Sequence, residues 1–268
     1  MANSIFKLKD GRDYDYLANN VESKSAILFH HGTPGDCTVW SSWVSGLSTV
    51  RAIAASRPGY GLSSRRRGRN VASDIDNNSE LLDHFGIEKF VSIGWSGGGP
   101  HALNMTRHPK NVGAITLAGV GEWGNDDLNF LAGMGPENHE EFGAALAGET
   151  EIENWMIKNS PAFKTVTGAD LISSFGGLIG DADKKALTPK VADENAAAYR
   201  RALSMGYYGC KMMIWHLCNL LDLRHDCSHL GLLIIGVPIA VVLGMSSVLF
   251  LLAFSDSSLA SVAQTLFS

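Results

Sequence analysis

The stretch Gly94-Trp95-Ser96-Gly97-Gly98-Gly99 decides the fold of this chain. It follows the apolar run of residues 89–93 and precedes residues 100–107, which have the composition of a helix. A serine between glycines, where a strand turns into a helix, indicates a bend that is too tight for larger side chains. Such a bend lifts the serine hydroxyl clear of the sheet, so Ser96 is a candidate nucleophile.

Apolar runs and helical patterns alternate on both sides of this bend. Asp10-Gly11 predicts a hairpin within residues 4–17. Short apolar runs predict strands at residues 25–30, 51–55, 90–95 and 112–118, and the spacing of apolar residues predicts a helix at 74–85. This alternation is typical of an α/β fold with a mostly parallel, doubly wound sheet.

The rest of the chain has a different pattern. Residues 125–204 read as helices with glycine-rich breaks, which indicates a helical cap inserted over the ligand-binding edge of the sheet. We therefore expect three parts: an N-terminal part of the α/β core at residues 1–124, the cap at 125–205, and a divergent C-terminal part of the core, with irregular strands and helix, at 206–268.

Composition narrows the classes of function. The chain has 268 residues, 45% of them hydrophobic, and a net charge of -5, which argues against nucleic acid as a partner. The basic run of residues 63–69 is expected to be a solvated loop. Without the apolar core of a signal peptide at the N-terminus, or a disulfide frame among the four cysteines, a cytoplasmic location is expected. No paired metal-ligand motif is present, so no metal site is predicted.

Three stretches, taken together, resemble the α/β-hydrolase family. They are His30-His31-Gly32-Thr33-Pro34-Gly35, Ser56-Arg57-Pro58-Gly59-Tyr60-Gly61 and Gly94-Trp95-Ser96-Gly97-Gly98-Gly99-Pro100-His101. The resemblance covers roughly residues 1–205 and is to the helical-lid kind that includes proline iminopeptidase-like and esterase-like members.

This resemblance implies a serine hydrolase that acts on an ester, amide or related acyl bond of a small molecule. Ser96 would be the nucleophile, and the oxyanion would be held by Gly97 and by the loop at Gly32 and Thr33. The lid would select the substrate. No cofactor or metal is needed for this chemistry.

The C-terminal part departs from the family pattern, which has an acid after a late strand and then a histidine. Residues 239–244 read as that strand, but Asp256 is the only carboxylate side chain downstream of it, and no histidine follows His229. The histidines at 30, 31, 84, 101 and 108 are expected to be structural or solvated. The catalytic acid is therefore unknown and no catalytic histidine is identified, so the predicted activity is impaired.

Two hypotheses address this departure. In the first, part of the C-terminal region is translated out of frame: reading from each third base, Met212 and Met213 both give aspartate, as in the acidic segment that the family often carries after the lid. In the second, the charge-free run of residues 230–254 is a membrane anchor, since it is long enough to span a bilayer. A catalytically inactive binding protein that keeps the pocket is a further alternative to the hydrolase.

Overall fold

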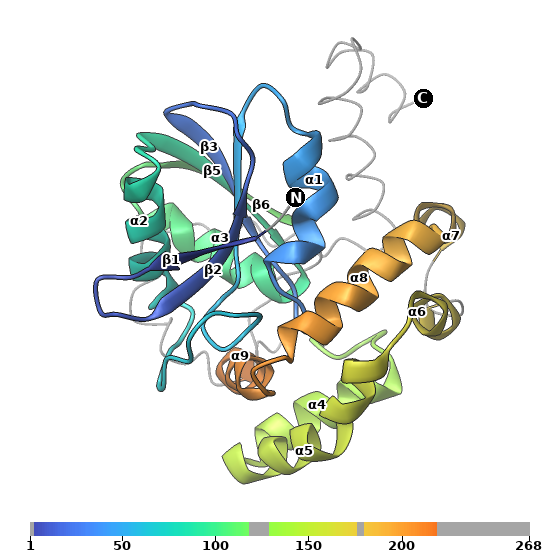
Figure 1. Cartoon of the computed structure of the whole chain (residues 1–268). Helices are drawn as coiled ribbons and strands as arrows, with labels where there is room; N and C mark the ends of the chain where they lie inside the picture. Colours follow the sequence, from blue (N-terminus) through green and yellow to red (C-terminus); the bar gives the residue numbers. More distant parts are fainter. Residues whose placement is uncertain (1–2, 118–128, 176–179, 219–268) are drawn as a thin grey trace.

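The computed structural model describes residues 3–117, 129–175 and 180–218. Its centre is a six-stranded sheet in the order β1-β2-β4-β3-β5-β6 (Figure 1). The strands are β1 (Ser4–Lys7), β2 (Asp13–Ala18), β3 (Ser25–His30), β4 (Arg51–Ala55), β5 (Lys89–Trp95) and β6 (Asn111–Leu117). The β1–β2 hairpin pairs antiparallel with β4, and β4, β3, β5 and β6 are parallel. The expected hairpin and the mostly parallel sheet are confirmed.

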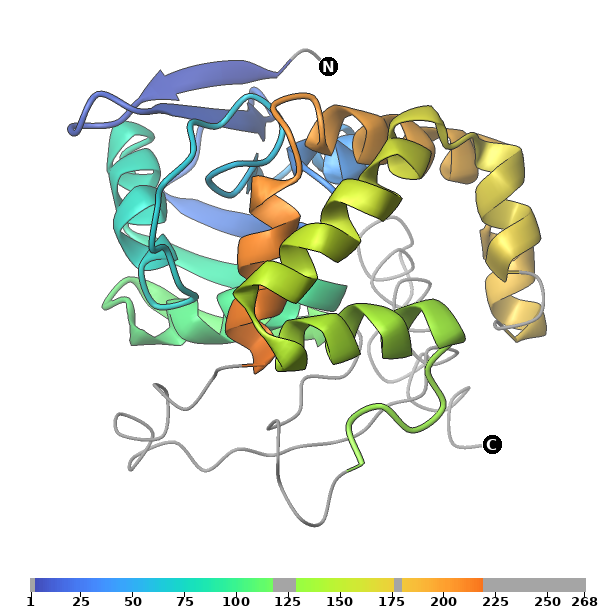
Figure 2. The ribbon, with the colours of Figure 1, turned by 90° about the horizontal axis from the view of Figure 1, so that it is seen from below.

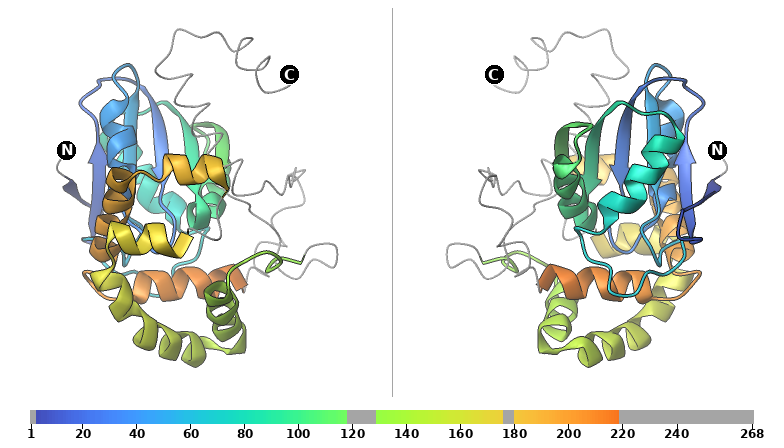
Figure 3. Two further views of the ribbon diagram at one scale, coloured as in Figure 1. Left: turned by 90° about the vertical axis from the view of Figure 1, so that its right-hand side faces the viewer. Right: turned by 90° about the vertical axis from the view of Figure 1, so that its left-hand side faces the viewer.

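Helices cover both faces of this sheet (Figure 3). Successive side chains of a strand point to opposite faces, so one strand packs against helices on both sides. On one face, Leu28 of β3 packs with Leu81 of α2 (Asp74–His84). On the other face, the next residue, Phe29, packs with Trp40 and Val44 of η1 (Cys37–Trp40) and α1 (Ser41–Gly46). Burial on both faces explains why β3 reads as an uninterrupted apolar run.

The strand order brings the loops after β3 and β5 together. From β3 the chain moves to β4 on one side, whereas from β5 it moves to β6 on the other side. The carboxyl ends of β3 and β5 are neighbours, with His30 in register with Gly94. Ligands bind at such a switch point in open α/β sheets. The chain continues from β5 through η2 (Ser96–Gly98), α3 (Gly99–Asn104) and η3 (Met105–Arg107).

Further helices follow β6 and lie beside this edge of the sheet (Figures 1 and 2). They are α4 (Pro136–Ala147), α5 (Glu149–Thr165), α6 (Gly168–Phe175), α7 (Asp181–Ala186), α8 (Pro189–Ala202) and α9 (Tyr208–Cys218). We call α4–α8 the cap helices. Phe142 of α4, Met156 of α5 and Met213 of α9 form one apolar cluster with Tyr60 of the core. In the described ranges, no helix has the length and hydropathy needed to cross a membrane.

One prediction about the core is wrong in part. The basic run of residues 63–69 ends in Arg69, which is buried rather than solvated, and its Nη2 donates a hydrogen bond to the carbonyl of Gly209 (3.0 Å). The strand expected at residues 239–244 and the charge-free run of residues 230–254 lie outside the described residues.

Candidate functional site

Ser96 stands directly after β5 in a backbone conformation that L-amino acids avoid. Its φ is +51°, and among the described residues it is the only non-glycine residue with positive φ. This conformation costs on the order of 1–2 kcal/mol and persists only where the surrounding structure imposes it. The Ser96 side chain is exposed, so the bend presents the hydroxyl outside the sheet.

The glycines on both sides of Ser96 are required by close backbone contacts. A Cβ on Gly94 would lie less than 3.0 Å from the carbonyl of Gly98. A Cβ on Gly98 would lie equally close to the carbonyl of His30, at the end of the neighbouring strand. The bend can therefore pack against β3 only if both positions lack a side chain.

The structure brings the four predicted site residues together. A Cβ on Gly32 would lie 3.2 Å from Cβ of Ser96, so the loop after β3 lies against the bend. A Cβ on Gly97 would lie 3.1 Å from Oγ1 of Thr33. The loop after β3, with Gly32 and Thr33, therefore lies directly against the bend that carries Ser96 and Gly97.

A buried arginine holds the loop after β3. The guanidinium of Arg57 donates to the carbonyl of His31, to the carbonyl of Gly32 (3.1 Å) and to Oγ1 of Thr33 (3.2 Å). It also lies over the ring of Tyr60, 5.0 Å from the centroid. The Tyr60 hydroxyl is 3.0 Å from Oγ1 of Thr33. Arg57 is only 2% exposed, so these contacts replace its hydration.

His31 is not available as a base. Its Nδ1 lies 2.8 Å from the carbonyl of Gly32, and its Nε2 accepts a hydrogen bond from the backbone N–H of Arg57 (3.0 Å). These partners require a neutral ring with the proton on Nδ1. Burial and the nearby positive charge of Arg57 lower the pKa of His31 well below its usual value. Both nitrogens are occupied, which supports the expected structural role.

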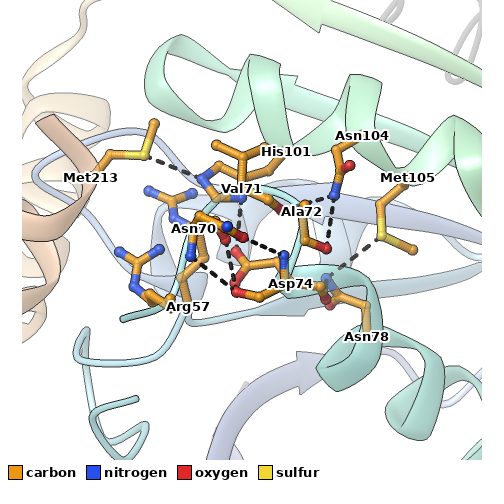
Figure 4. Close-up of polar contacts among 12 residues, drawn as sticks. Arg57, Asn70, Val71, Ala72, Asp74, Asn78, His101, Asn104, Met105 and Met213 are labelled. Atoms are coloured by element: carbon orange, nitrogen blue, oxygen red, sulfur yellow. Dashed lines mark hydrogen bonds and ion pairs between the residues drawn. The ribbon is translucent and has the colours of Figure 1, made fainter. Parts of the chain in front are cut away.

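His101 forms a buried polar pair one turn after the bend (Figure 4). Its Nδ1 lies 2.8 Å from Oδ2 of Asp74, and its Nε2 lies 3.2 Å from the sulfur of Met213. The methyl group of Met213 would be 3.2 Å from a Cβ on Gly97. Met213 therefore lies against both the His101 ring and the Gly97 segment, and Nε2 of His101 faces the sulfur of Met213.

Within the described ranges, the Ser96 hydroxyl has no hydrogen-bond partner, and no base for it is identified. Sequence reasoning missed the roles of Arg57, Tyr60 and Met213 around the site. For the first two, the signal was present: the stretch of residues 56–61 had indicated the fold. Asp256 and the histidines at 225 and 229 lie outside the described residues.

Comparison with known proteins supports the α/β-hydrolase fold. Residues 25–142 match the family described as alpha/beta hydrolase fold. The chain is 34% identical over 154 residues to the uncharacterized hydrolase YcgS of Bacillus subtilis, which covers 56% of this chain and 50% of that protein. It is also 30% identical over 131 residues to the biotin biosynthesis bifunctional protein BioHC of Teredinibacter turnerae, which covers 46% of this chain and 22% of that protein.

A different relative matches a short part of the chain. Over 39 residues it is 69% identical to the C4-dicarboxylate TRAP transporter large permease protein DctM of Vibrio cholerae, covering 15% of this chain and 9% of that protein. The chain thus spans half or less of the length of each of these curated relatives.

Solved structures share the architecture. A hydrolase from Pseudomonas aeruginosa is similar with a TM-score of 0.54 and 17% identity, over 84% of this chain and 75% of that one. An epoxide hydrolase from Vigna radiata is similar with a TM-score of 0.57 and 13% identity, over 85% of this chain and 75% of that one. The sheet order, the bend and the sequence match lead to one conclusion: the chain has the α/β-hydrolase fold, and its residues 25–142 match the model of that family.

Proposed function

We propose that this protein is a serine hydrolase in which Ser96 attacks the carbonyl carbon of a small-molecule ester, amide or related acyl compound. One observation carries the proposal: Ser96 has a positive φ and is exposed beside the backbone of Gly32, Thr33 and Gly97. This is the arrangement that acyl transfer needs, with a nucleophile next to two amide donors. Removal of one such donor typically costs about 2.7–4 kcal/mol of transition-state stabilisation.

The residue at the bend favours acyl transfer over other reactions of the fold. Fold relatives that open epoxides or remove halides use aspartate at this position, and this chain has Ser96. A serine hydroxyl forms an acyl-enzyme ester, which water then hydrolyses. Similarity to epoxide hydrolases of 13–17% identity therefore supports the fold and not their reaction.

The cap helices support a small-molecule substrate. Phe142 and Met156 of the cap pack with Tyr60 and Met213, which in turn contact Thr33 and the Gly97 segment. Acyl groups that reach Ser96 would meet these apolar side chains. We infer that the cap acts as the lid that selects the acyl group.

A hydroxyl without a base reacts slowly, and neither His31 nor His101 is placed to act as one. We therefore expect an impaired enzyme. Loss of a single triad member in a well-studied serine hydrolase lowers turnover by many orders of magnitude. The competing proposal is an inactive binding protein that keeps the bend and the pocket.

A fluorophosphonate probe distinguishes the two proposals, because it phosphonylates an activated serine without needing a known substrate. We expect the full chain to be labelled on Ser96, slowly but saturably, and the Ser96→Ala variant to remain unlabelled. Ser41→Ala is the matched control, since Ser41 is a half-buried serine at the start of α1, on the opposite face of the sheet from α2. Labelling that is absent, or equal in Ser96→Ala, would refute the hydrolase proposal.

A second function, membrane attachment, has one specific observation in its favour. The 39-residue match to a transporter permease indicates that part of the chain is shared with a membrane protein. We infer that the match falls on the charge-free run of residues 230–254. Such a match would also argue that this part is read in frame. Retention of the full chain in the membrane pellet after an alkaline wash, and release of a chain that ends at residue 218, would support attachment; release of both would refute it.

A further inference from the structure

We propose that Arg57 is a positioning residue for the oxyanion site: its guanidinium holds the Gly32–Thr33 peptide so that the Thr33 N–H is available to a group bound at Ser96. The inference rests on the proposed function for its catalytic consequence. Its structural part, the orientation of one peptide, can be tested independently of any activity.

The Gly32 carbonyl is held in one direction. Its oxygen accepts hydrogen bonds from Nδ1 of His31 (2.8 Å) and from the Arg57 guanidinium (3.1 Å). In a planar trans peptide, the N–H points away from the C=O. A carbonyl held on the Arg57 side therefore directs the Thr33 N–H to the opposite side. In the described part of the chain, this N–H donates to no other group.

The side chain of Thr33 is held from the same direction. Oγ1 of Thr33 lies within hydrogen-bond distance of both the Arg57 guanidinium (3.2 Å) and the Tyr60 hydroxyl (3.0 Å). The guanidinium in turn lies over the Tyr60 ring, 5.0 Å from its centroid. Rotation of the Gly32–Thr33 peptide would break the contact of Arg57 with the Gly32 carbonyl, while its contacts with His31 and Thr33 hold the residues on both sides. The loop is thus fixed before any substrate binds, and such preorganisation is what makes an oxyanion site effective.

A planar fork is needed for this role. Three acceptors are arranged around one guanidinium, and a lysine ammonium at the end of a flexible stem cannot meet them with the same geometry. The backbone N–H of Arg57, which bonds to Nε2 of His31, survives any side-chain substitution. A change at position 57 therefore removes the contacts to the loop and leaves the ring of His31 oriented.

The chain offers a matched control in Arg69. It is equally buried (2% exposed) and lies near the same Tyr60 ring (5.7 Å), but its guanidinium donates to Gly209 and not to the loop after β3. Crystal structures of Arg57→Met and Arg69→Met would be compared with that of the unchanged chain. We expect the Gly32–Thr33 peptide to rotate or become disordered only in Arg57→Met. An unchanged peptide in Arg57→Met would overturn the proposal.

Phosphonylation kinetics test the consequence. We expect Arg57→Met to lower the maximal rate of Ser96 labelling by about 100-fold with little change in the half-saturating probe concentration, the loss typical of one oxyanion donor. Added guanidinium ion, at concentrations below those that unfold the variant, should restore part of the rate, and Arg69→Met should keep most of it. A loss that appears equally in both variants, or only in probe affinity, would contradict a positioning role.

The proposal remains testable if Arg57→Met does not fold or if the unchanged chain is not labelled. Should Arg57→Met fail to fold, Arg57→Lys and Tyr60→Phe would replace it, with the same peptide orientation and labelling rate as readouts; an unchanged peptide and rate in both would overturn the proposal. Should the unchanged chain resist labelling altogether, the hydrolase proposal fails, and the crystal structures alone decide the role of Arg57.

Discussion

Nδ1 of His101 lies 2.8 Å from Oδ2 of Asp74, and each residue is only 1% exposed. Burial lowers the pKa of His101 to about 4, because it outweighs the attraction of the Asp74 carboxylate. Burial by itself would raise the pKa of Asp74, but the attraction of His101, Arg69 and Arg57 outweighs burial and lowers this pKa to about 2. At neutral pH the pair is therefore a neutral imidazole beside an ionised carboxylate.

This pair predicts how the free energy of unfolding changes with pH. The unfolded chain takes up a proton on His101 near pH 6.5, whereas the folded chain resists it until about pH 4, so stability falls as the pH is lowered through this window. The loss attributable to His101 is at most about 3 kcal/mol. The free energy of unfolding, measured with urea between pH 7.5 and 4.5, should depend less steeply on pH in His101→Gln than in the unchanged protein. His84→Gln is the control, because His84 is exposed. An equal pH dependence in the unchanged protein, His101→Gln and His84→Gln would contradict the role given to His101.

The positive φ of Ser96 predicts that function and stability oppose each other at this position. Glycine adopts such a φ without a steric penalty, whereas alanine does not. We expect Ser96→Gly to be more stable than Ser96→Ala by about 1 kcal/mol. Both variants lack the hydroxyl, so the comparison isolates backbone strain. Equal denaturation midpoints for the two variants would argue that the bend is relaxed.

The glycines around Ser96 were recognised from the sequence as a tight bend, although one of the contacts that requires them is with a different strand. A test follows from the close approach of Gly98 to the His30 carbonyl. Gly98→Ala cannot be accommodated by rotating a side chain, since the obstacle is backbone, and we expect a loss of several kcal/mol or failure to fold. Gly113→Ala in β6 is the control, because a Cβ there would meet nothing within 4 Å. A Gly98→Ala protein with an unchanged melting temperature would refute this packing.

Strands and turns were also predictable, whereas the buried arginines of the core were not. β3 reads as a strand from its own residues, because both its faces are buried. The burial of Arg57 and Arg69, in contrast, depends on carbonyl acceptors far along the chain, such as that of Gly209. A basic run has no local property that separates the arginine that finds such an acceptor from those that remain in water.

The catalytic acid and base illustrate a second limit of sequence reasoning. The structure accounts for His31 and His101 by partners that lie 26 and 27 residues away, Arg57 and Asp74. A base is defined by its position relative to Ser96 in space, and that position is set by tertiary packing. The sequence could exclude a family-like histidine after His229, but it could not assign the histidines before it.

The ion pairs of Arg201 predict how strongly the cap is held to the core. Its guanidinium, at the end of α8, donates to Asp15 of β2 (2.8 Å) and to Asp36 of the loop after β3, and both carboxylates are fully buried. Arg201→Met would leave two buried charges without their partner, and we expect a loss of about 3 kcal/mol in the free energy of unfolding.

Arg200→Met is the matched control, since Arg200 is exposed and donates only to the carbonyl of Val166. Adding Asp15→Asn to Arg201→Met should recover part of the loss, because one uncompensated charge is removed. Equal stabilities for Arg201→Met and Arg200→Met, measured by urea unfolding at pH 7, would mean that apolar packing alone attaches the cap.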